Sequence, residues 1–159
     1  MTEEQAKQPE QVFEIQRVFL KDASFESPSS PAVFTREFKP DVNVELHSGN
    51  KQLAEHVYEV VLEITVTVKV GDDIAYLIEI KQSGVFAAAG YPEEQMGQLL
   101  GSYCPNILYP FAREVISDLA VKGGFPQILL APINFDALYN QHLQEQAKAR
   151  DKVDDATKH

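Results

Sequence analysis

The sequence has few of the residues that build disulfide, metal or nucleotide sites. Cys104 is the single cysteine among 159 residues, so no disulfide can form within the chain. It precedes a proline and has no histidine near it, which favours a buried structural thiol over a nucleophile. The four histidines lack metal-ligand spacing, and the glycine pair 123–124 is not followed by the lysine and hydroxyl residue of a P-loop. These absences argue against catalysis, and we expect neither an enzyme nor a cofactor.

Long apolar runs and excess positive charge are also missing. No stretch approaches the length that spans a membrane, and the polar, acidic N-terminus lacks the basic and apolar regions of a signal peptide. We therefore expect a cytoplasmic protein that does not insert into the membrane. The net charge of −10 disfavours nucleic acid and favours basic partners, although solubility is the more common reason for an acidic surface.

The run from Gly101 to Glu114 is the most distinctive part of the chain. It is rich in aromatic and aliphatic residues and is interrupted by Pro105 and Pro110. It contains no acid–base pair and no phosphate-binding glycine loop. This composition indicates packing and apolar surface, so it directs the functional question toward binding.

The N-terminal half alternates between apolar and polar residues, which predicts four strands with one wet face and hence an antiparallel sheet. The clearest strand runs from Tyr58 to Val70. We expect turns at 48–51 and 71–73, and Pro40 favours an edge position or a bulge. The predicted strands cover residues 13–26, 33–47, 58–70 and 74–82.

The pattern changes after Gly84, and helices follow a loop over 85–92. A helix over 93–102 is expected to stop at Pro105, and the main helix is expected over about 109–122. An extended loop over 125–133 leads to a last helix, capped by Asn134. The predicted fold is α+β, a four-stranded antiparallel sheet with C-terminal helices packed on one face. This domain covers 12–145, between flexible tails at 1–11 and 146–159.

Two features favour binding. Leu77 shares parity with Glu79 and Lys81, and Leu20 shares parity with Asp22, so both leucines are expected on the wet face. An outward leucine beside carboxylates is typical of a docking patch for a basic partner, although a lone exposed leucine is also normal. The second feature is a set of aromatic residues that could line an apolar peptide groove or pack in the core: Phe86, Tyr91, Tyr103, Tyr109 and Phe111.

From Phe13 to about Gln146 the chain resembles the SecB family of bacterial protein-export chaperones. Several linked motifs carry the resemblance, and their order makes it specific. They are IQR at 15–17, KD and SFE within 21–26, VYEVVL at 57–62, YCPNIL at 103–108, ARE at 112–114, FPQ at 125–127 and LAPINFDAL at 130–138.

The resemblance implies a cytosolic chaperone that keeps unfolded precursor proteins translocation-competent and passes them to the SecA ATPase without hydrolysing nucleotide. It also implies a homotetramer, built as a dimer of dimers. An acidic sheet face would dock the basic, zinc-bound C-terminal tail of SecA, and the zinc belongs to SecA. The matching positions here are Asp22, Glu26, Leu77 and Glu79.

Two further residue sets follow from the resemblance. Positions at the tetramer contact fall on Ile78, Ile80 and Gln82. Candidates for the groove that binds client proteins are Phe86, Tyr91, Tyr103, Leu108, Tyr109 and Phe111.

Two other functions remain open at this point. One is a small-molecule-binding or enzymatic sheet–helix domain that uses the apolar face as a pocket, which convergent polar groups or a perturbed titratable pair would favour. The other is a SecB-like general or antitoxin-linked chaperone.

Overall fold

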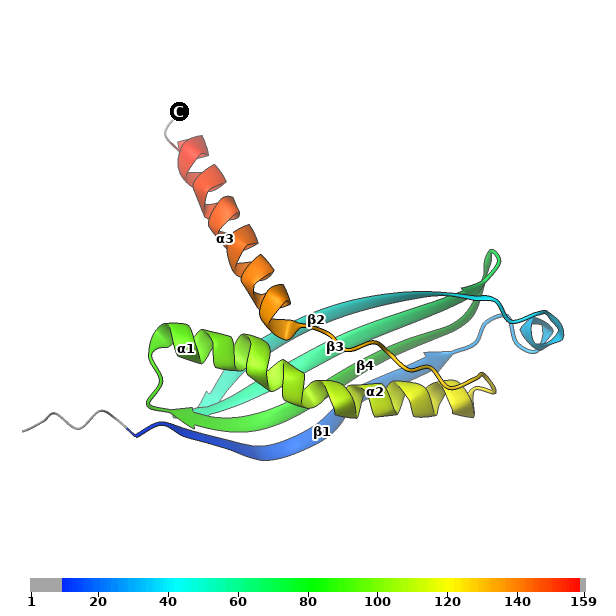
Figure 1. Cartoon of the computed structure of the whole chain (residues 1–159), viewed down its shortest axis with the longest axis horizontal. Coiled ribbons are helices and arrows are strands. Elements are labelled where there is room, and N and C mark those ends of the chain that lie inside the picture. The colour runs from blue at the N-terminus through cyan, green and yellow to red at the C-terminus, as the bar shows by residue number, and fades with distance from the viewer. Residues whose placement is uncertain (1–9, 158–159) are drawn as a thin grey trace, which may run out of the picture.

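A computed structural model describes residues 10–157 and shows an antiparallel sheet with one long helical run, residues 93–122, along one face (Figure 1). The strand order is β1-β4-β3-β2, and every neighbouring pair is antiparallel. The predicted α+β fold is thereby confirmed. In chain order the elements are β1 (Val12–Glu26), η1 (Ala32–Thr35), β2 (Pro40–Ala54), β3 (Val57–Val70), β4 (Asp73–Ala89), α1 (Glu93–Gln98), η2 (Leu99–Tyr103), α2 (Cys104–Lys122) and α3 (Phe135–Thr157).

Strands β3 and β4 form the centre of the sheet and have two chemically different faces. Opposite residues of antiparallel neighbours lie on the same face, so the register defines each face. The inner face, toward α2, carries Val60, Leu62, Ile64, Val66 and Val68 of β3 with Tyr76, Ile78 and Ile80 of β4. The outer face carries Glu59, Glu63, Thr65, Thr67 and Lys69 of β3 with Leu77, Glu79, Lys81 and Ser83 of β4.

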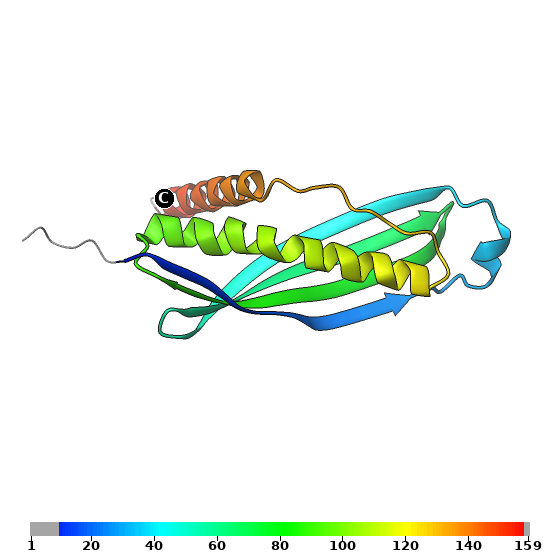
Figure 2. The ribbon, with the colours of Figure 1, turned by 60° about the horizontal axis from the view of Figure 1, so that its bottom comes forward.

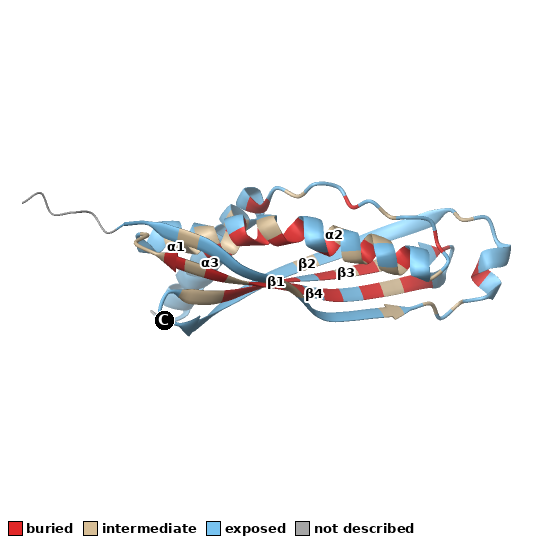
Figure 3. Ribbon diagram, turned by 90° about the horizontal axis from the view of Figure 1, so that it is seen from below, coloured by how far each residue is buried: buried red, intermediate tan, exposed pale blue. Residues whose placement is uncertain are grey.

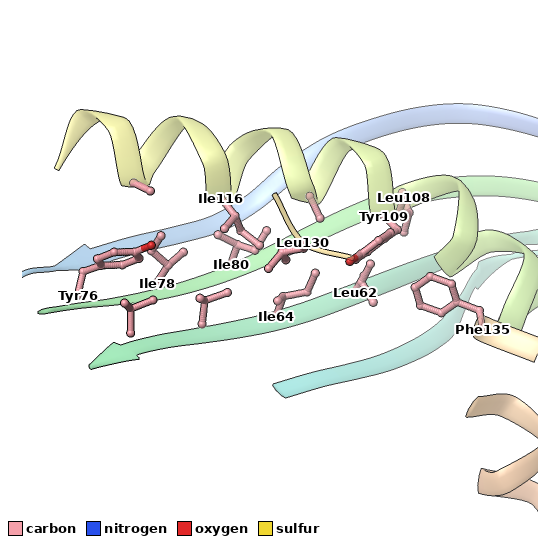
Figure 4. Packing of buried hydrophobic residues seen from close by; sticks show 14 of the residues in the cluster. Leu62, Ile64, Tyr76, Ile78, Ile80, Leu108, Tyr109, Ile116, Leu130 and Phe135 are labelled. Carbon is pink, nitrogen blue, oxygen red and sulfur yellow. The ribbon is translucent and has the colours of Figure 1, made fainter. Parts of the chain in front are cut away.

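Helix α2 covers the inner face and completes the core. Figure 4 shows Ile116 of α2 directed toward Ile80 of the sheet, with Leu108 on the same side of the helix and Ile64 on the neighbouring strand. All four side chains are almost fully buried. Burying one such side chain contributes about 1.5–3 kcal/mol, so this apolar contact fixes which face the helix takes. Figure 3 shows the same division, with buried residues concentrated where α2 meets the sheet.

Strand β1 departs from a strict two-residue repeat. It carries two register shifts against β4, one of them between Leu20 and Asp22. The extra residue at a bulge changes the parity of every residue after it. Leu20 therefore pairs with Gln82 on the inner face, whereas Asp22 pairs with Lys81 on the outer face. The prediction that Leu20 shares the wet face with Asp22 is wrong for this reason.

Strand β2 begins later and ends later than predicted. Residues 33–35 lie in the short helix η1, and the strand starts at Pro40, a position that needs no backbone donor. The predicted turn at 48–51 is wrong, because Gly49 and Asn50 pair with β3 and the strand continues to Ala54. The chain turns instead at 55–56, where His56 adopts a positive φ of 59°.

Strand β4 extends to Ala89, so the predicted loop over 85–92 is wrong for most of its length. Residues 85–89 pair with β1, residues 85–87 also pair with β3, and Phe86 has no exposed surface. Alanines at 87–89 weaken the apolar alternation that marks a strand. Pairing from both neighbours therefore overrides a weak local signal.

The helices α1, η2 and α2 run without a break, although a stop was predicted at Pro105. Proline lacks an amide donor and clashes with the preceding turn in a regular helix. Here the turn before Pro105 is a π-helix, in which the Cys104 amide donates to the Leu99 carbonyl. The wider turn lies directly before Pro105. Pro105 itself occupies the first turn of α2, a position at which a helix tolerates proline.

A loop over 123–134 crosses the inner side of the molecule beside α2 and leads to α3 (Figure 2). As predicted, Asn134 caps α3, with its side-chain oxygen accepting from the Ala137 amide at 3.0 Å. Tyr139 packs over Gly97 and Gly101, where an added Cβ would come within 2.6 Å of the tyrosine side chain. These glycines therefore seat the start of α3 on η2.

Helix α3 continues to Thr157 and leaves the body of the molecule (Figure 1). This conformation differs from the coil expected over 146–159. This segment is rich in Gln, Glu, Ala, Lys and Arg, which are strong helix formers. A polar composition of this kind is typical of disorder, but it also suits a helix that is exposed to solvent. The predicted N-terminal tail falls mostly outside the described residues.

Candidate functional site

The outer face of the sheet is open to solvent and brings the predicted docking residues together. Glu26 lies opposite Leu77, Asp22 lies opposite Lys81, and Glu79 follows Leu77 by two residues on the same face. Leu77 is partly exposed and the carboxylates are exposed. We call Asp22, Glu26, Leu77 and Glu79 the acidic patch. Its geometry offers one apolar contact flanked by three negative charges.

Sequence reasoning left out Glu45, which belongs to the same region. Glu45 of β2 lies opposite Thr65 of β3, and Thr65 lies opposite Glu79 of β4. The alternation of apolar and polar residues in β2 places Glu45 on the wet side. Its alignment with Glu79 depends on the register between strands, which the sequence does not show.

Next to the acidic patch, a buried carboxylate is held by three other strands. Glu59 of β3 accepts hydrogen bonds from Lys21 of β1 at 3.1 Å and from Ser83 of β4 at 2.9 Å. Lys51 of β2 lies 3.7 Å away. Burial alone would raise the pKa of Glu59, but the hydrogen bonds and the lysine charges outweigh it, and the pKa is lowered. Glu59 is thus ionised at neutral pH.

A hollow of about 380 Å³ opens over this carboxylate. Lys81 also lines it, 3.6 Å from Glu63. We call Lys21, Lys51 and Lys81, with Glu59 beneath them, the lysine pocket. The pocket leaves no local pattern in the sequence, because its residues come from four strands, and Lys21 and Glu59 are 38 residues apart.

The predicted client-groove residues divide into core and surface. Phe86 and Leu108 have no exposed area and Tyr109 is buried, so these three belong to the core and not to a surface groove. Tyr103 and Phe111 are about half exposed, at 52% and 49%, and Tyr91 is partly buried. The three accessible aromatic residues remain candidates for client contact.

Tyr91 and Tyr103 line a cleft of about 410 Å³ between the α1–η2 segment and the start of α3. Four side-chain amides share this cleft and can pair with the backbone of an extended peptide. They are Gln95, Gln98, Asn106 and Asn134.

A second, wider cleft of about 710 Å³ separates α2 from the loop over 123–134. Apolar side chains on its two rims are exposed, with Val121 on α2 and Leu129 on the loop, the latter 79% exposed. Both side chains add to the exposed apolar surface on the helical side of the molecule.

Tyr109 ties that loop to the helix. Its hydroxyl donates to the Ala131 carbonyl at 2.5 Å, and the Arg113 guanidinium lies 5.2 Å from its ring centre. Burial raises the pKa of Tyr109, while the charge of Arg113 partly opposes this. The tyrosine therefore stays neutral and able to donate at physiological pH.

The residues expected at the tetramer contact lie on the inner face and are buried within the single chain. Ile78 and Ile80 pack beneath α2, and Gln82 donates from Nε2 to the Phe19 carbonyl at 3.1 Å. Side chains without exposed area cannot touch a neighbouring subunit directly. Any influence on assembly would therefore pass through the position of α2.

The remaining chemistry is sparse. Cys104 is fully buried, and burial raises the pKa of its thiol to about 12, so it is a neutral packing group. Within residues 10–157, no three His, Cys, Asp or Glu side chains gather as metal ligands would. Over the same residues, no helix combines the length and apolar character required to cross a membrane.

The sequence matches the family described as preprotein translocase subunit SecB over residues 4–146. The chain belongs to the SecB family. Two curated relatives named protein-export protein SecB agree: that of Nitrosococcus oceani is 55% identical, covering 93% of this chain and 90% of the relative. That of Methylococcus capsulatus is 54% identical, covering 98% and 99%.

This SecB chain is thus a protein-export chaperone, with preproteins and the Sec translocase as its partners. Members of the family are not enzymes, which agrees with the expectation from the sequence. This result displaces the hypothesis of a small-molecule or enzymatic domain.

A solved relative supports the fold. It is a SecB-like chaperone of Mycobacterium tuberculosis in complex with a ChAD peptide from the HigA1 antitoxin. It aligns with a TM-score of 0.64 at 14% identity and covers 76% of this chain and 90% of its own. At that identity the similarity concerns the fold alone.

Proposed function

We propose that this SecB chain acts in the cytoplasm as a homotetramer, a dimer of dimers, that holds unfolded precursor proteins and delivers them to SecA. The observation that carries the proposal is the separation of two surfaces on opposite sides of one sheet. The helical side offers exposed apolar and amide groups, and the outer face offers the acidic patch.

Client binding belongs to the helical side. An unfolded chain exposes apolar side chains and unpaired backbone amides. A surface that binds both must offer apolar and hydrogen-bonding groups together, and it need not select for the client's sequence. Tyr103, Phe111 and Leu129 supply exposed apolar area, and the amides around Tyr91 supply donors and acceptors. Several such surfaces on a tetramer let one long client bind at many points and gain avidity.

Holding activity is tested by following the refolding of a denatured precursor. At one tetramer per client, with the oligomer confirmed by native mass, we expect refolding to be slowed strongly. A client that has already folded is the control and is expected not to bind. Unchanged refolding at this ratio would contradict the proposal.

SecA docking belongs to the acidic patch. The basic, zinc-bound tail of SecA would place positive side chains against Asp22, Glu26 and Glu79 and an apolar group on Leu77. Because these carboxylates are solvent-exposed, each contributes modestly, and the sum is expected to weaken with added salt.

Charge reversal separates docking from client binding. We expect Glu79→Lys to weaken binding of the SecA tail by about tenfold, because it replaces an attraction with a repulsion at the centre of the patch. Holding of an unfolded client should be unchanged. Glu145→Lys in α3 is the matched control, with the same charge change far from the patch. Equal SecA affinity for Glu79→Lys and wild type, measured by calorimetry, would refute the assignment.

A further inference from the structure

The lysine pocket carries a local excess of positive charge on the outer face of an acidic chain. Three lysines face two carboxylates, those of Glu59 and Glu63, in a protein with a net charge of −10. A hollow lined in this way favours an anionic group, whereas the surrounding surface repels one.

The three lysines are not equally engaged. Lys21 contacts both oxygens of Glu59, at 3.1 and 3.2 Å. Lys51 and Lys81 lie 3.7 and 3.6 Å from their carboxylates and are 64% and 48% exposed. Each ammonium group has three donors, so these two lysines retain donors for a further acceptor. Lys21 and the ionised Glu59 balance each other's charge, and Ser83 donates a further hydrogen bond to that carboxylate.

The pocket is continuous with the acidic patch. Lys81 follows Glu79 by two residues on the same face of β4, and Asp22 of the patch lies directly opposite Lys81. Two residues of strand span about 7 Å, so the negative and positive regions are side-chain neighbours. A segment lying on the patch therefore reaches the pocket within two to four extended residues, about 7–14 Å.

We propose that the lysine pocket binds a carboxylate of the same partner segment that places basic residues on the acidic patch. This inference rests on the docking function proposed above and specifies it: the outer face recognises a segment in which positive and negative charge lie within a few residues of each other. The carboxylate would accept from Lys51 and Lys81. The hollow is large enough for one such group with water, and too small for a folded element.

The expected gain is moderate and depends on salt. Charge-assisted hydrogen bonds are stronger than neutral ones, but both lysines are substantially exposed. We expect a difference of about three- to tenfold in affinity at low salt, declining as ionic strength rises.

A binding cycle tests the proposal with the full-length chain. The probes are the SecA C-terminal tail and the same peptide with every carboxylate replaced by its amide. The variants are wild type, Lys51→Gln with Lys81→Gln, and a control pair, Lys39→Gln with Lys69→Gln, which removes two charges outside the pocket. Lys21 is left unchanged because it holds Glu59.

We expect wild type to bind the carboxylate peptide several-fold more tightly than the amide peptide. That difference should vanish in the pocket variant and persist in the control pair. Equal binding of the two peptides by wild type, or a difference that survives in the pocket variant, would overturn the inference. Glu79→Lys measured in parallel reports on docking itself: if it binds like wild type, the docking proposal fails separately.

Discussion

Replacing Phe86 with alanine is expected to lower the free energy of unfolding by about 3–5 kcal/mol, the usual effect of removing a buried aromatic side chain. Phe86 has no exposed surface and stacks on Phe13 with ring centres 5.8 Å apart. Its ring also packs over Gly84. The deletion leaves a cavity between β1 and α2, so the effect falls on stability and reduces client binding only through unfolding.

Phe111→Ala is the matched control and should give the opposite pattern. About half of Phe111 is already in solvent, so the stability change should stay below about 1 kcal/mol. If its exposed ring contacts clients, the slowing of client refolding should weaken while the fold persists. Chemical denaturation and the refolding assay measure the two effects. A large stability loss for Phe111→Ala together with a small one for Phe86→Ala would contradict this division.

The Cys104 thiol is expected to react with a thiol reagent about a thousandfold more slowly in the folded chain than in the unfolded chain. Burial raises its pKa from 9.0 to about 12. Near pH 8 the thiolate fraction falls from about one tenth to about one ten-thousandth, and the thiolate is the reactive form. Because Cys104 is the single cysteine, a chromogenic disulfide reagent reports on this residue alone.

The same shift predicts how stability depends on pH. Above pH 9 the unfolded chain loses the thiol proton while the folded chain keeps it, so the unfolded state is increasingly favoured. The contribution of Cys104 to stability is complete below pH 9 and declines between pH 9 and about 12. Cys104→Ala should remove this part of the alkaline decline. Fast labelling of the native chain at pH 8, or an unchanged pH slope in the variant, would count against a buried neutral thiol.

Strand β1 shows which features of a strand its own sequence cannot encode. The residues of this strand were recognised, yet Leu20 was placed on the wrong face because a bulge shifts the register between Leu20 and Asp22. Whether a bulge forms depends on the partner strand, here β4, and no local pattern within β1 reveals it. The acidic patch was nevertheless predicted as a set, because its members came from the family resemblance.

The aromatic residues illustrate a second limit. Phe86, Leu108 and Tyr109 were grouped with Tyr103 and Phe111 as one groove, although the first three lie in the core. The type of a side chain predicts that it makes apolar contacts, but not whether those contacts lie in the core or in a surface groove. The loop over 123–134 decides the matter for Tyr109, because the Ala131 carbonyl in that loop accepts a hydrogen bond from the Tyr109 hydroxyl.

The sequence alone determined the features that depend on neighbouring residues. The two faces of β3 and β4 follow from their two-residue alternation, the outward position of Leu77 follows from its parity, and the cap at Asn134 follows from its side chain. The tertiary structure decided what depends on distant pairing: the register of β1, the division between core and surface aromatics, and the lysine pocket. In the pocket, residues of four strands meet at the Glu59 carboxylate. Their contact is fixed by sheet order and register, which are stabilised by burial across the whole domain and leave no local trace in the chain.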